Sequence, residues 1–128
     1  MRAAAAGIAA LRIDADVVLT SPLVRCRQTV DIVAARLGRE PVEDRRLAPG
    51  MDLEGLGDAL LRHPDAGSVL VCGHQPDLSE VVAALTGGGA VEFRKGSLAL
   101  LDLDGARPGG GRLRALYPPS ALRRLGAS

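Results

Sequence analysis

The sequence predicts an α/β domain of three layers, α/β/α, with a mostly parallel central sheet and an antiparallel hairpin at its carboxyl end. Short apolar runs alternate with segments whose apolar residues recur at helical spacing, which is the pattern of strands joined by crossover helices. The last two apolar runs are instead joined by a Gly-rich turn, which favours an antiparallel pair. A length of 128 residues suits one domain with one core.

The amino-terminal half is predicted to alternate between helices and short strands. Residues 2–11 are rich in alanine and favour a helix. Residues 15–20 form a short apolar run typical of a buried strand, and apolar residues at helical spacing follow over 30–37. A short edge strand is expected at 41–43, and a further helix at 53–61 that ends before a proline.

The carboxyl-terminal half repeats the alternation once and then changes to a hairpin. Residues 68–72 are a second buried strand, and 78–85 show helical spacing before a run of three glycines. The hairpin is predicted from 97–103 and 113–117, and a last short helix from 120–125.

Composition excludes several classes of partner. The formal net charge of +1 gives no attraction toward nucleic acid or an anionic membrane surface, and 2% aromatic residues supply no stacking platform for bases. No apolar run approaches the roughly 18 residues needed to span a bilayer. Cys26 and Cys72 are isolated cysteines rather than a disulfide framework, so a reducing, cytoplasmic location is expected. No nucleic-acid or membrane partner is therefore predicted.

Polar turns follow the two buried strands, and both contain side chains suited to an anion. Ser21 and Arg25 follow the first strand, and His74 follows the second. The carboxyl ends of parallel strands meet at one sheet edge, where helix N-termini point, so Arg25 and His74 are expected to be neighbours. Arginine is unfavourable in the first turn of a helix unless an anion is bound, and guanidinium binds phosphate bidentately. Taken singly, Arg25 could equally be a solvated surface residue, and a lone histidine is more often structural.

Other phosphate and metal chemistries fit the sequence poorly. Cysteine phosphatases need an arginine six positions after the nucleophile, but Leu78 stands there for Cys72 and Ile32 for Cys26. The glycines at 87–89 lack the Gly-Lys-Ser/Thr of a P-loop. Two cysteines and two histidines this scattered do not form a zinc site, and Cys72 is interpreted as a small buried strand residue.

Four segments together resemble the histidine phosphatase superfamily, also called phosphoglycerate mutase-like. The similarity is greatest to its branch of small, bacterial, SixA-type phosphohistidine phosphatases, and it extends over nearly the whole chain. The segments are Val18–Thr29, Val69–Pro76, Phe93–Ser97 and Leu116–Pro119. Two such segments in the right order, with matching surroundings, are a specific signal.

The resemblance implies a phosphatase that works through a phosphohistidine enzyme intermediate. Arg25 matches a phosphate-binding arginine, His74 matches the histidine that stabilises the transferring phosphoryl group, and Ser21 lines the same loop. The implied substrate is phosphohistidine on a protein, or alternatively a small phosphate ester. No cofactor and no metal are implied. Asp52 and Glu54 lie in the loop where a general acid is conceivable, without a clear choice between them.

The family's nucleophilic histidine, in an Arg-His-Gly motif at the end of the first strand, has no counterpart in this sequence. His63 stands at the end of a predicted helix beside a proline and is interpreted as a surface residue. We therefore expect residues 1–128 to be a single, N-terminally truncated domain that is inactive alone. The missing central strand is expected between the strands that end at Thr20 and Cys72. The explanation we favour is a start site placed too late, so that the native protein carries the nucleophile. The alternatives are a non-catalytic phosphate- or phosphoprotein-binding module and an inactive remnant.

Overall fold

Three short parallel strands form the centre of the computed structural model, which describes residues 2–91 and 93–127. They are β1 (Val17–Thr20), β2 (Pro41–Glu43) and β3 (Val69–Cys72), in the order β2-β1-β3. As predicted, Pro41–Glu43 is an edge strand, and its proline costs the sheet little there.

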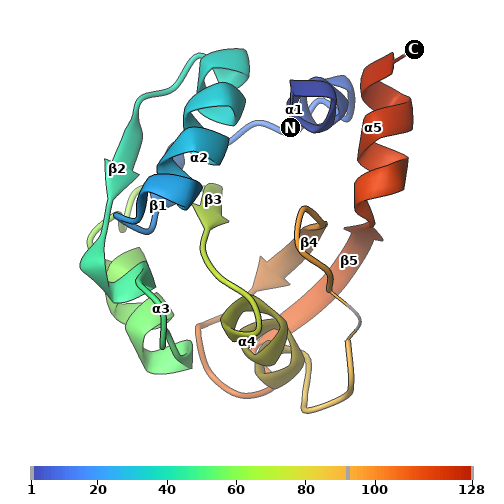
Figure 1. Ribbon diagram of the computed structural model, residues 1–128. Helices are drawn as coiled ribbons and strands as arrows, with labels where there is room; N and C mark the ends of the chain where they lie inside the picture. Colours follow the sequence, from blue (N-terminus) through green and yellow to red (C-terminus); the bar gives the residue numbers. More distant parts are fainter. Residues whose placement is uncertain (1, 92, 128) are drawn as a thin grey trace.

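Helices cover both faces of this sheet, as the sequence predicts (Figure 1). Side chains alternate along the strands, so Val18 and Leu70 pack with α2, while Leu19 and Val71 join the core on the side of α3 and α4. One face is covered by α1 (Arg2–Ala10), α2 (Val24–Leu37) and α5 (Pro119–Ala127), and the other by the 3₁₀ turn η1 (Arg45–Leu47), α3 (Leu53–Leu61) and α4 (Asp77–Leu85). No helix within the described residues is long and apolar enough to cross a membrane.

The predicted antiparallel hairpin consists of β4 (Leu98–Leu103) and β5 (Gly111–Tyr117). Its register shifts between Leu100 and Leu101, which marks a local bulge. In the part of the chain that the structure describes, the hairpin is a separate sheet that does not hydrogen-bond with β1, β2 or β3. Its apolar residues nevertheless contribute to the cores on both faces of the molecule.

The expected position of an additional strand, between the strands ending at Thr20 and Cys72, is wrong. These strands pair directly, with Val17 opposite Val69 and Thr20 opposite Cys72. The space between them is therefore a normal parallel ladder, which leaves room for no further strand. Among the described residues, the outer edges of β2 and β3 have no partner strand, and Figure 1 shows β4 beyond the edge of β3.

Some helix and strand boundaries differ from the sequence prediction. At the start of the strands, side-chain hydrogen bonds take the place of pairing between the strands. The strands begin at Val17 and Val69, later than expected, because the Asp16 carboxylate accepts hydrogen bonds from Gly67 N at 2.7 Å and Ser68 N at 3.2 Å. At the carboxyl end, α5 is longer than predicted because it starts at Pro119, and proline is well suited to the first helical position.

The first and last helices approach each other unusually closely. Gly7 of α1 and Gly126 of α5 have no side chain, and a Cβ added to either would collide with backbone of the other helix. The collisions would be with Leu122 O and Ala3 O respectively. The two ends of the described chain are therefore packed side by side, as Figure 1 also shows.

Replacing Gly7 with alanine should destabilise the protein. In a helix, alanine is more favourable than glycine by about 0.5–1 kcal/mol. Overpacking costs about 1–3 kcal/mol, so the clash with α5 should outweigh this gain and lower the free energy of unfolding. We expect a lower midpoint for Gly7→Ala in urea unfolding followed by circular dichroism. A midpoint at or above that of the wild type would contradict the close contact between α1 and α5.

Candidate active site

Three loops meet at the carboxyl edge of the parallel sheet. Ser21 N, directly after β1, donates to Cys72 O at 3.0 Å and so extends the pairing of β1 with β3 by one residue. The loop that follows η1 is joined to the start of α4 by Gly50 N, which donates to the Asp77 carboxylate at 2.8 Å. The loops therefore have fixed relative positions at the edge where the sequence predicts the site.

Ser21 and His74 are brought into direct contact at this edge. His74 Nε2 lies 2.8 Å from Ser21 Oγ, and which of the two donates depends on the histidine tautomer. Ser21 is completely buried and its hydroxyl also accepts from Leu23 N at 3.3 Å, at the start of α2. The imidazole is thus held in one orientation by a side chain that is itself fixed.

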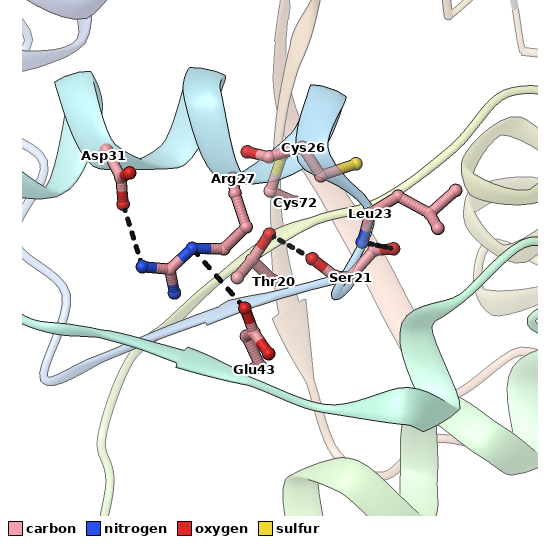
Figure 2. A network of polar contacts seen from close by, with 8 residues as sticks. All are labelled: Thr20, Ser21, Leu23, Cys26, Arg27, Asp31, Glu43 and Cys72. Atoms are coloured by element: carbon pink, nitrogen blue, oxygen red, sulfur yellow. Dashed lines mark hydrogen bonds and ion pairs between the residues drawn. The ribbon is translucent and has the colours of Figure 1, made fainter.

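Arg25 lies exposed in the first turn of α2. That turn contains no acidic residue, and the N-cap, Leu23, supplies no side-chain hydrogen bond. Within the described residues, the Arg25 guanidinium makes no ion pair or hydrogen bond. Arg27, two residues later, instead pairs with Asp31 at 3.2 Å and Glu43 at 3.6 Å (Figure 2). Arg25 is therefore available for an external anion, close to the positive end of the helix dipole.

The loop that carries His74 is restrained on its far side as well. Gln75 Oε1 accepts from Ser79 N at 3.2 Å and lies 2.6 Å from Ser79 Oγ. Ser79 Oγ is also 2.9 Å from Phe93 O, which places the segment after α4 against the start of that helix. This network reduces the reorganisation that His74 would need when it meets a charged ligand.

Two thiols adjoin this site, a feature that the sequence interpretation missed. Cys26 Sγ lies 3.6 Å from His74 Nε2 and 3.5 Å from Gly73 O, and Cys72 Sγ lies 3.9 Å from Cys26 O. Both cysteines are free. The sequence contains a signal for this proximity, because Cys26 follows Arg25 directly and Cys72 precedes His74 by two residues. Burial, together with the neighbouring Cys26 thiol, raises the pKa of Cys72 to about 12.

The remaining candidate residues have other positions. Asp52 caps α3 by accepting from Gly55 N at 2.8 Å, and Glu54 is exposed in the first turn of that helix. His63 follows α3 and lines an open depression of about 370 Å³ at the amino end of β1, opposite to the edge that carries His74. Among the described residues, no group of three or more His, Cys, Asp or Glu side chains could hold a metal ion.

Comparison with known proteins shows a similar fold. The model of the histidine phosphatase superfamily (branch 1) matches residues 1–57, the segment that contains Ser21 and Arg25. The structure of the protein histidine phosphatase SixA complexed with tungstate matches with a TM-score of 0.81 and 27% identity, over 94% of this chain and 80% of that one. The amino-terminal part of the chain thus matches the histidine phosphatase superfamily, and its fold is similar to that of SixA.

Two further proteins extend the comparison. A SixA-type structure from Nakamurella multipartita matches with a TM-score of 0.71 and 26% identity, over 94% of this chain and 81% of that one. An uncharacterised protein of Picosynechococcus sp. PCC 7002 is 41% identical over 102 residues, which is 77% of this chain. The chain spans 60% of the length of that relative.

Cys72 should be nearly inert toward alkylation in the folded protein. The thiolate is the reactive form, and a pKa raised from 9.0 to about 12 strongly lowers its population near pH 8. Iodoacetamide labelling read by peptide mass spectrometry should therefore give a much lower Cys72 rate in native than in urea-unfolded protein. Equal rates in the two states would contradict the buried position of this thiol.

Proposed function

We propose that this domain binds a phosphoryl group at the Ser21–His74 edge and that the complete protein hydrolyses phosphohistidine on a partner protein. The contact between His74 and buried Ser21 carries the proposal, since it fixes a hydrogen-bond donor next to the helix turn that presents Arg25. The tungstate complex of the similar SixA supports it, because tungstate is a tetrahedral oxyanion like phosphate.

The residues of this chain would act by stabilising charge. Arg25 would bind two phosphoryl oxygens with its planar guanidinium, and His74 would donate to a third. Negative charge on these oxygens is redistributed during transfer, so donors already fixed in place lower the barrier without reorganising. Ser21 would hold the ring of His74 rather than contact the substrate through a free hydroxyl, since that hydroxyl is already engaged.

The similarity to the histidine phosphatase superfamily suggests a histidine nucleophile and a phosphohistidine intermediate. The nucleophile would attack phosphorus as the bond to the substrate imidazole breaks, and water would then cleave the new nitrogen–phosphorus bond. The chain has two histidines; His74 serves the stabilising role and His63 lies at the opposite end of β1. We therefore propose that the nucleophile enters on a strand outside these 128 residues, paired with the free edge of β3, so that it ends beside His74.

Replacing Arg25 with alanine should weaken phosphate binding by roughly 10- to 150-fold, because a charge-assisted hydrogen bond contributes about 1.5–3 kcal/mol. Inorganic phosphate binding to this chain can be measured by calorimetry or by NMR titration. Arg36→Ala is the matched control, because Arg36 is exposed in the last turn of the same helix. Equal losses in the two variants would mean that only overall charge matters and would refute the site.

The protein as its source cells make it should carry the proposed nucleophile. We expect an intact mass above the 13.2 kDa of this chain, together with turnover of a phosphohistidine-containing protein. We also expect a phosphoenzyme that is labile to acid, as phosphohistidine is. A native mass of 13.2 kDa combined with phosphate binding and no turnover would favour the non-catalytic binding module instead.

A further inference from the structure

The phosphoryl chemistry proposed above uses neither of the thiols beside it. Cys26 is 5% exposed, on the buried face of α2, and it contacts His74. Cys72 is the last residue of β3, and its sulfur lies 3.9 Å from the Cys26 carbonyl oxygen. Figure 2 shows the two cysteines side by side, between the first turn of α2 and the end of β3. They join the two elements that present Arg25 and His74.

We propose that Cys26 and Cys72 form a reversible disulfide when the protein meets hydrogen peroxide, and that this bond weakens binding at the phosphate site. The disulfide itself is independent of the proposed function, whereas its effect on phosphate binding rests on it. In a reducing compartment the pair would remain as thiols, which is the state of the structure.

The geometry assigns different roles to the two cysteines. Cys26 Sγ lies 3.6 and 3.9 Å from the two ring nitrogens of His74, so the imidazole can take its proton. The resulting thiolate attacks peroxide, the O–O bond breaks, and the departing hydroxide takes up that proton as water. Cys26 is left as a sulfenic acid.

Cys72 then resolves the sulfenic acid. Its thiol proton leaves with the sulfenic hydroxyl as water while the S–S bond forms and the S–O bond breaks. In sum, two thiols are oxidised and one hydrogen peroxide is reduced to two waters. The raised pKa of Cys72 supports this order, because a thiol that ionises at about 12 is a poor first nucleophile.

The disulfide would act on the site through the elements that it joins. An S–S bond of about 2.05 Å replaces contacts between non-bonded groups, so Cys26 must turn toward β3 and away from His74. The imidazole loses one neighbour, and the first turn of α2 shifts together with Arg25. Because the site depends on the spacing between Arg25 and His74, a small shift is enough to weaken a bidentate contact.

Peroxide oxidation of the folded, reduced chain tests the disulfide. After alkylation of the remaining thiols, peptide mapping should show one link between the peptides that contain Cys26 and Cys72. The intact mass should fall by two hydrogens, and dithiothreitol should reverse both changes. The proposal is overturned if both residues stay reduced, or are oxidised only to sulfinic acids, while circular dichroism shows a folded protein.

Phosphate titration of the same samples tests the switch. The oxidised chain should bind inorganic phosphate at least about tenfold more weakly than the reduced chain, with recovery in dithiothreitol. Cys72→Ala is the control, because it leaves the contact between Cys26 and His74 in place. It should bind as the reduced wild type does, and in peroxide it should form no disulfide and show no tenfold loss of affinity.

The possible failures can be told apart. If the disulfide forms but the affinity for phosphate is unchanged, only the proposed effect of the disulfide on phosphate binding is refuted. A reduced chain that does not bind phosphate refutes the proposed function and the switch with it, whereas the mapped disulfide stands.

Discussion

The direct parallel pairing of β1 with β3 is the constraint on which the candidate site depends. Its register sets Thr20 opposite Cys72, and one further hydrogen bond, from Ser21 N to Cys72 O, carries the alignment into the loops. His74 therefore meets Ser21 although more than fifty residues separate them along the chain. A slip of one residue would turn alternate side chains to the other face and separate the two, so the apolar cores on both faces of the sheet also preserve the site.

The sequence could predict the edge at which the site forms but not the order of its strands. Apolar runs ending in polar turns are a local pattern, and parallel strands place their carboxyl ends together whatever their order. This is why the sequence predicts that Arg25 and His74 share one edge of the sheet. Which strands are neighbours depends instead on how the connecting helices pack across the sheet. The hydrophobic periodicity of the sequence carries no information about that packing. The expected gap between the strands ending at Thr20 and Cys72 was wrong for that reason.

The contrast between Arg25 and Arg27 shows why residue type alone does not define a phosphate site. Both are arginines in the first turn of α2, and the sequence cannot distinguish their surroundings. Arg27 is held by Asp31 one helical turn later and by Glu43 on the neighbouring strand, so its charge is already compensated. Arg25 is exposed in the same turn, where the helix supplies no acid. A phosphoryl group there would compensate both the guanidinium and the helix dipole.

The spacing of one residue between Arg25 and Cys26 couples the two proposals physically. Successive residues of a helix point about 100° apart, so one side chain of this turn is exposed at the edge while the next enters the core. The buried face continues through Val30, Val33 and Ala34, which fixes the rotation of α2 against the sheet. Any bond that moves Cys26 must therefore rotate or shift the whole turn, and Arg25 moves with it. An anion site on a rigid helix is in this way sensitive to chemistry on the buried side of the same turn.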